Sequence, residues 1–211
     1  MAALERIVLA SGNAGKLREL RALLAPTGIA VVAQAELGVG EAEEPHPTFV
    51  ENALAKARHA SRATGLPALA DDSGVCVPAL GGAPGVRSAR YAPDSGGERS
   101  DAMNNARLVH ELAGGLDRAA YYYCALVLVR RSDDPQPVIA DGLWHGTILH
   151  APRGSGGFGY DPYFLLADAG MTVAELDETR KNQHSHRGRA MRALLERMRE
   201  ARLIGPGPER G

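Results

Sequence analysis

A glycine-rich turn near the amino end has the residue types that bind anions. It consists of Ser11, Gly12, Asn13, Ala14, Gly15 and Lys16. Glycines let backbone N–H groups approach a phosphate, a following helix adds partial positive charge at its first turn, and Lys16 adds a full charge. The turn is not a P-loop, because its glycine-to-lysine spacing is too short and Leu17 follows the lysine. It predicts either an anion cradle or an ordinary strand-to-helix turn capped by Asn13.

Acidic side chains gather in two further segments. They are Glu43 and Glu44 in the first, and Asp71 and Asp72 in the second. The aspartates follow a short apolar run over residues 66–70, where we expect a strand to end. Neighbouring carboxylates are unfavourable there unless a cation neutralises them, and carboxylate oxygens are ligands that Mg²⁺ prefers. The pattern predicts either a cation site shared by the two segments or an Asp-Ser-Gly turn.

A third group of residues has the types that recognise a nucleobase. It comprises Phe158, Gly159, Tyr160 and Asp161, followed downstream by Lys181, His186 and Arg187. An aromatic ring beside glycines can stack on a base, and His or Arg can donate hydrogen bonds to the oxo groups of the base. The alternative interpretation is a hairpin turn followed by a helix cap at Ser185.

Composition describes an ordinary globular chain. The 211 residues are 45% hydrophobic, and 24 Lys and Arg oppose 25 Asp and Glu. Such a chain can bury one core, or two lobes that share a sheet, and its balanced charge excludes a general nucleic-acid coat protein. No apolar run approaches the roughly 20 residues of a membrane span, and no signal peptide begins the chain, so we expect a cytoplasmic protein. Cys76 and Cys124 lie in apolar runs and are expected to be buried thiols.

Charge is unevenly distributed along the balanced chain. Residues 41–51 contain four glutamates and neither Lys nor Arg, whereas residues 180–202 contain eight basic and two acidic residues. Each segment can be a solvated helix face. If the fold brings them to one cleft, they supply cation ligands and anion clamps.

Apolar periodicity predicts alternating strands and helices. We expect strands over 6–11, 29–34, 66–70, 121–129 and 138–149, and helices over 17–24, 48–65, 103–112 and from 185 onward. A capping box formed by Thr48 and Glu51 opens the second helix. The last two strands must be antiparallel because their turn is short, so the class is α/β with a mixed sheet. We expect a single domain over residues 1–203 and a disordered tail over 204–211.

Seven segments in chain order carry a specific resemblance. They are Ser11-Gly12-Asn13-x-x-Lys16, Glu43-Glu44, Thr48-Phe49-x-Glu51-Asn52-Ala53-x-x-Lys56-Ala57, Ala70-Asp71-Asp72-Ser73-Gly74, Gly81-Gly82-x-Pro84-Gly85-x-x-Ser88-Ala89-Arg90, Gly156-Gly157-Phe158-Gly159-Tyr160-Asp161-Pro162 and Ser185-His186-Arg187-Gly188. Together they resemble the Ham1/RdgB family, the inosine/xanthosine triphosphate pyrophosphatases, over nearly the whole chain.

The resemblance implies an elongated two-lobed α/β fold with a long central mixed sheet and an active site in the cleft between lobes. It implies a homodimeric, Mg²⁺-dependent enzyme that hydrolyses dITP, ITP, dXTP and XTP to the monophosphate and pyrophosphate. Deaminated purines are thereby removed from the nucleotide pool. Asp72 matches the catalytic base and lies near the metal with Glu43 and Glu44. The matched substrate-binding positions are Ser11 to Lys16, Lys56, Ser73, Phe158 to Asp161, Lys181, His186 and Arg187.

Discrimination between bases has a physical explanation at purine position 2. A donor from Arg187 or His186 there tolerates hypoxanthine and favours xanthine, but opposes the amino group of guanine. Three alternatives to an inosine/xanthosine triphosphate pyrophosphatase remain. They are a sensor that binds a triphosphate without cleaving it, a Maf-like pyrophosphatase with another base preference, and an RNA-binding module built on the basic carboxyl-terminal helix.

Overall fold

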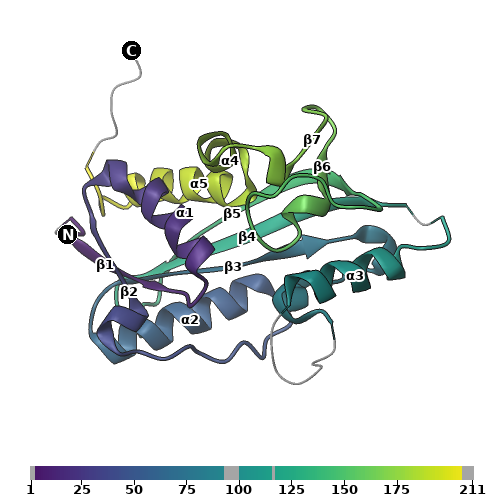
Figure 1. Cartoon of the computed structure of the whole chain (residues 1–211). Helices are drawn as coiled ribbons and strands as arrows, with labels where there is room; N and C mark the ends of the chain where they lie inside the picture. Colours follow the sequence, from purple (N-terminus) through teal and green to yellow (C-terminus); the bar gives the residue numbers. More distant parts are fainter. Residues whose placement is uncertain (1–2, 93–99, 116, 206–211) are drawn as a thin grey trace, which may run out of the picture. The chain divides into compact units, whose positions relative to one another are not determined.

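The predicted strands and helices occur in the predicted order, and the short strands Phe164–Leu166 and Met171–Thr172 were not predicted. The computed structural model describes residues 3–92, 100–115 and 117–205. Its strands are β1 (Arg6–Ala10), β2 (Ala30–Ala33), β3 (Ala68–Cys76), β4 (Ala119–Val129), β5 (Val138–Ile148), β6 (Phe164–Leu166) and β7 (Met171–Thr172) (Figure 1). Its α-helices are α1 (Ala14–Leu24), α2 (Phe49–Thr64), α3 (Asp101–Glu111), α4 (Glu178–His184) and α5 (His186–Glu200).

The strands form one mixed sheet in the order β2-β1-β3-β4-β5-β6-β7. β1 is parallel to β2 and β3, whereas β6 is antiparallel to β5 and β7, so the predicted α/β class with a mixed sheet is confirmed. The chain divides into two compact units. Unit 1 comprises residues 1–72, 124–142 and 187–211, and unit 2 comprises residues 73–123 and 143–186. The single domain over residues 1–203 stays a prediction.

Unit 1 has a hydrophobic core on each face of its strands. Ile7 and Leu9 of β1 pack with α1 and α5, whereas Val8 and Ala10 pack with the alanines of α2. Successive side chains of a strand point to opposite faces, which is why one strand serves both cores. Figure 1 shows α1 and α5 above these strands and α2 below them.

Unit 2 has a separate core that is richer in aromatic residues. Leu108 and Leu112 of α3 belong to it, together with Tyr122 of β4, Trp144 of β5 and Phe164 of β6. The rings of Tyr122 and Phe164 lie 4.4 Å apart between centroids. Tyr122 and Phe164 are therefore fixed in a packed core of unit 2.

The predicted end of the third strand is wrong. β3 does not stop at Ala70 but continues through Asp71, Asp72 and Ser73 to Cys76. Both aspartates are buried and each is paired with cations, so the chain can stay extended without leaving a carboxylate uncompensated. The Asp-Ser-Gly segment is part of a strand and not a turn.

The predicted helices are confirmed, and the described residues include one further α-helix. Thr48 caps α2 by accepting a hydrogen bond from the N–H of Glu51, and Gly65 ends the helix in the left-handed conformation. The sequence prediction missed α4, which begins after the cap Asp177. Both cysteines are buried and free, as expected. In the described part of the chain, no helix has the length and apolar character needed to cross a membrane. The predicted tail falls mostly on residues 206–211, outside the described residues.

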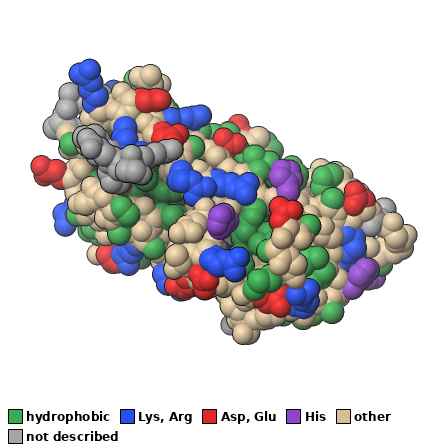
Figure 2. Space-filling model, turned by 90° about the horizontal axis from the view of Figure 1, so that it is seen from above, with side chains coloured by type: hydrophobic (Ala, Val, Ile, Leu, Met, Phe, Trp, Pro, Cys, Tyr) green, Lys and Arg blue, Asp and Glu red, His purple; other side chains and the backbone are tan. Residues whose placement is uncertain are grey.

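The basic segment over residues 180–202 contains side chains in two different environments. Lys181 and Arg187 are buried, whereas Arg180, Arg189, Arg192, Arg197 and Arg202 are exposed. On the face that Figure 2 shows, Lys and Arg side chains are interspersed with Asp and Glu. Most of the basic side chains of this segment are therefore in contact with solvent, as the first interpretation of the segment predicted. Lys181 and Arg187 are the two that are buried.

Replacing Gly74 by Ala is expected to destabilise the fold. A Cβ at Gly74 would lie 2.4 Å from the carbonyl oxygen of Gly85 and 2.3 Å from Oγ of Ser88. Because a backbone atom cannot move aside freely, we expect a loss of about 1–3 kcal/mol in the free energy of unfolding, measured in urea. Gly40→Ala is the control, since nothing lies within 4 Å of its Cβ position. Equal stability of the two variants would contradict the close packing of β3 at Gly74.

Candidate functional site

Strand register brings the glycine-rich turn beside the acidic residues. Ala10 of β1 pairs with Ala70 of the parallel strand β3. The next residues, Ser11 and Asp71, therefore lie at the same edge of unit 1. Ser11 follows the carboxyl end of β1, where ligands bind in α/β proteins, whereas β3 continues past this point to Cys76.

The turn after β1 is both a capped helix start and a cationic corner. Oδ1 of Asn13 accepts a hydrogen bond from the N–H of Lys16 at 3.0 Å, and Oγ of Ser11 accepts one from the N–H of Asn13 at 3.2 Å. Nζ of Lys16 lies 2.6 Å from Oδ1 of Asp71. The two interpretations of this turn, a cap and a charged cradle, are therefore compatible, and the turn does contact the acidic strand.

Asp71 is held in a buried ion network on the face of the sheet that α1 and α5 cover. Nε of Arg187 lies 3.0 Å from Oδ2 of Asp71, and its NH1 pairs with Glu19 of α1. Sγ of Cys124 donates to the same Oδ2 at 3.2 Å. Burial alone raises the pKa of Asp71, but attraction to Arg187, Lys16 and Lys56 outweighs it and holds that pKa well below its usual value. Asp71 is thus a permanent anion inside the protein.

Asp72 points to the opposite face, toward α2. Nδ2 of Asn52 lies 3.3 Å from Oδ2 of Asp72, and Nζ of Lys56 lies 3.2 Å from Oδ1. Burial is the largest cause of a raised pKa at Asp72, and the carboxylates of Glu44 and Asp71 raise it further, against the attraction of Lys56 and Lys16. A carboxylate with a raised pKa is a better proton acceptor, which is what a general base needs.

Lys56 joins Asp72 to the acidic segment before α2. Its Nζ lies 2.6 Å from Oε1 of Glu44 as well as 3.2 Å from Asp72. Burial disfavours its charge, but attraction to Asp72, Glu44 and Asp71 prevails and raises the pKa of Lys56. Glu43 is exposed, whereas Glu44 is half-buried. Of these two glutamates, Glu44 is the one whose carboxylate contacts Lys56.

The oxygen donors at this corner fit a magnesium ion that also binds phosphate. Within the described residues, no group of three or more His, Cys, Asp or Glu side chains is placed to hold a metal. Glu44 and Asp72 nevertheless contact the same ammonium group, so their oxygens already surround one small cation. Mg²⁺ usually takes one or two carboxylates and completes its shell with waters and substrate phosphates.

In unit 2, Asp161 connects the residues predicted to recognise a base. Its Oδ2 accepts from Nζ of Lys181 at 2.7 Å and from the N–H of Phe158 at 3.0 Å, and its Oδ1 accepts from the hydroxyl of Tyr122 at 2.9 Å. Nζ of Lys181 also lies 4.5 Å from the centroid of the Phe158 ring. The structure therefore brings Phe158, Asp161 and Lys181 together within unit 2.

The remaining predicted base-site residues have mixed surroundings. Tyr160 is buried, and its hydroxyl donates to the carbonyl of Ser88 at 2.8 Å, which is a packing role. The backbone of Gly159 is held by α3, because its N–H donates to Asp101 and its carbonyl accepts from Asn105. The ring of His186 stacks on Tyr122 with centroids 4.6 Å apart. Ser73 follows Asp72 in β3 and is half-buried.

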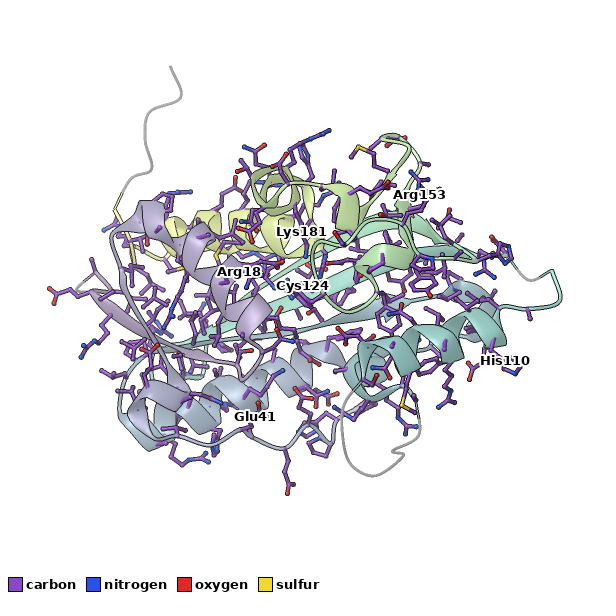
Figure 3. All side chains as sticks on the ribbon, viewed as in Figure 1. Arg18, Glu41, His110, Cys124, Arg153 and Lys181 are labelled. Atoms are coloured by element: carbon purple, nitrogen blue, oxygen red, sulfur yellow. The ribbon has the colours of Figure 1, made fainter. Side chains whose placement is uncertain are left out.

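Arg187, expected to contact the substrate and offered as a donor at purine position 2, lies in a buried ion network. It is 1% exposed and bound to two carboxylates within unit 1. Its direct contact with a base stays a prediction. Figure 3 labels Cys124 and Lys181, the thiol that contacts Asp71 and the ammonium group that contacts Asp161.

Sequence reasoning missed several residues of these networks as site residues, among them Glu19, Asn52, Asp101 and Tyr122. Asn52 was present only as part of a matched motif. It accepts from the N–H of His46 and donates to the carbonyl of His46, so it ties the acidic segment to α2. Nothing in the sequence marks Glu19, whose burial and pairing with Arg187 follow from the fold.

Comparisons with known proteins identify the family of the chain. The model of the Ham1 family matches residues 7–197. A dITP/XTP pyrophosphatase of Ralstonia nicotianae is 66% identical over 196 residues, covering 93% of this chain and 98% of the relative. A dITP/XTP pyrophosphatase of Burkholderia pseudomallei is 65% identical over 201 residues, covering 95% and 97%.

Solved structures give the same result. A HAM1 protein from Coxiella burnetii superposes with a TM-score of 0.84 at 44% identity, covering 93% of this chain and 100% of that one. The Staphylococcus aureus Ham1 protein gives 0.80 at 34% identity, covering 93% and 99%. The fold is that of an α/β protein with a mixed sheet and an acidic corner beside a glycine-lysine turn. The chain belongs to the Ham1 family.

Removing Arg187 is expected to destabilise the protein strongly. Arg187→Ala leaves the buried carboxylates of Asp71 and Glu19 facing each other without their shared cation, which costs about 3–5 kcal/mol. Chemical unfolding measures the loss. Arg197→Ala, on the exposed side of the same helix, is the control and is expected to stay within about 0.5 kcal/mol of the wild type. If Arg187→Ala were equally stable, the ion network would not be the anchor of Asp71.

Proposed function

We propose that the chain hydrolyses dITP, ITP, dXTP and XTP to the nucleoside monophosphate and pyrophosphate, and so removes deaminated purines from the nucleotide pool. Membership of the Ham1 family and the similarity to dITP/XTP pyrophosphatases support this substrate class. One observation in the structure carries the chemistry. Asp72, with a raised pKa, lies at one corner with Lys56, Glu44 and the adjoining Lys16–Asp71 pair.

The roles of the chain's own residues follow from this arrangement. Lys16 and Lys56 bind phosphate oxygens and offset the charge that develops on the leaving pyrophosphate. Asp72 accepts a proton from water while the water oxygen bonds to the α-phosphorus. The bond from that phosphorus to the bridging oxygen then breaks, and pyrophosphate leaves with the electron pair. Asn52 orients Asp72 through its 3.3 Å hydrogen bond.

The proposal includes Mg²⁺ held by Asp72 and Glu44, with Glu43 outside the site. When bound, the ion supplies Lewis-acid polarisation of the phosphate oxygens. The shared position of the two carboxylates on one ammonium group supports this ligand pair.

The base is proposed to lie against Phe158, with His186 donating near purine position 2. A stacked aromatic ring selects for a base, and a donor at position 2 opposes the amino group of guanine. The proposal further includes a homodimer in the cytoplasm, with no nucleic acid or membrane as partner. The resemblance supports the dimer, the balanced charge supports the absence of nucleic acid, and the lack of a long apolar run supports the absence of a membrane.

Asp72→Asn is expected to lower kcat for dITP about 10²- to 10⁴-fold, because the variant has no carboxylate to accept the proton. Release of pyrophosphate from dITP, XTP, dGTP and ATP measures this, with Mg²⁺ and with EDTA. Asp141→Asn is the control, since Asp141 is an exposed residue of β5. Binding of dITP by the wild type without any release of pyrophosphate would favour the triphosphate sensor and contradict the enzyme.

Glu44→Gln is expected to raise the Mg²⁺ concentration for half-maximal activity by about tenfold or more, because a ligand is lost. Glu43→Gln is the matched control and is expected to leave this concentration unchanged. A magnesium titration of both variants at saturating dITP makes the comparison. The reverse result, with Glu43→Gln more affected, would reject Glu44 as the ligand.

A further inference from the structure

Tyr122 of β4 touches two of the groups proposed to recognise the base, although no motif of the sequence includes it. Its hydroxyl donates to Oδ1 of Asp161 at 2.9 Å, and its ring stacks on the ring of His186 at an interplanar angle of 8°. The ring also packs on Phe164. We propose that Tyr122 is the positioning residue that sets base specificity, by fixing Asp161 and His186 relative to each other within unit 2.

Asp161 transmits the position of Tyr122 to the loop that carries Phe158. The carboxylate is 3% exposed and accepts from three donors, which are the hydroxyl of Tyr122, the ammonium group of Lys181 and the N–H of Phe158. The loop lies so close that a Cβ at Gly157 would be 2.1 Å from Oδ2 of Asp161. A rotation of this carboxylate therefore moves both Lys181 and the backbone of Phe158.

The hydroxyl of Tyr122 is what prevents that rotation. A buried carboxylate oxygen that loses its donor turns toward another donor, because an unsatisfied buried acceptor is unfavourable. The ring of Tyr122 is fixed from two sides, by Phe164 and by His186, so the hydroxyl is presented at one place. Tyr122 thus couples the donor proposed at purine position 2 to the ring proposed to stack on the base.

This inference rests on the proposed function, and the experiment separates the two. Tyr122→Phe removes only the hydroxyl and keeps the ring stacked in its core. We expect KM for dITP to rise about three- to tenfold, as for one lost hydrogen bond, with kcat nearly unchanged. The ratio of kcat/KM for dITP to that for dGTP is expected to fall by a similar factor. Tm is expected to fall by no more than about 4 °C.

Tyr121→Phe is the matched control, because the neighbouring hydroxyl contacts the thiol of Cys76 and not Asp161. It is expected to keep the wild-type KM and base preference. Binding of dIMP, measured by calorimetry on both variants, gives a second readout that needs no catalysis, and only Tyr122→Phe is expected to weaken it.

Three outcomes are decisive. A wild-type chain that does not cleave dITP overturns the proposed function, whereas weaker dIMP binding confined to Tyr122→Phe still supports the positioning of the base. Unchanged KM, base preference and dIMP binding in Tyr122→Phe overturn the role of Tyr122. An equal loss of activity on dITP and dGTP, with unchanged base preference and a large fall in Tm, also overturns it and assigns Tyr122 to the fold alone.

Discussion

The compensation of two adjacent buried carboxylates is the constraint on which the site in unit 1 depends. Asp71 and Asp72 lie inside a strand, and burying a charge is strongly unfavourable unless cations and hydrogen bonds neutralise it. Arg187 and Lys16 neutralise the first carboxylate, and Lys56 neutralises the second. The helices α1, α2 and α5 each contribute one of these cations, so the same contacts that stabilise the strand also arrange the site.

Alternation along the strand divides the work between the two aspartates. Asp71 faces α1 and α5, where cations hold its pKa low, and Asp72 faces α2, where burial raises its pKa. Two neighbouring carboxylates whose pKa values are displaced in opposite directions are a common sign of different roles. Asp71 anchors Lys16 at the turn, and Asp72 is left as the group with the properties of a base.

Helix starts and strand neighbours could be predicted from the sequence, because residues close together in the chain determine them. Asn13 and Thr48 cap helices that begin one residue later, and the strands on either side of the short turn before Val138, β4 and β5, are neighbours in the sheet. The continuation of β3 through Asp71 could not be predicted, since its partner Arg187 is 116 residues away. The proximity of the acidic strand to the glycine-lysine turn was expected from motif order, and strand register explains it.

The base-site group illustrates the same limit. Phe158, Asp161 and Lys181 were singled out by residue type, and the structure brings them together. The sequence indicates only that Tyr122 belongs to a buried strand. Nothing nearby in the chain predicts that its hydroxyl donates to Asp161, which lies 39 residues later. Residue types thus predicted which side chains could contact a ligand. They did not predict which side chains, such as Tyr122, hold those in position.

A crystal structure of the wild-type chain with Mg²⁺ and a dITP analogue that has a non-cleavable α,β-imido link tests the central claim most directly. The account predicts phosphate oxygens on Lys16 and Lys56, the ion on Glu44 and Asp72, and Asp71 still bound to Arg187 without touching the ion. Phosphates bound away from both lysines, or Asp71 as the ligand in place of Asp72, would contradict it.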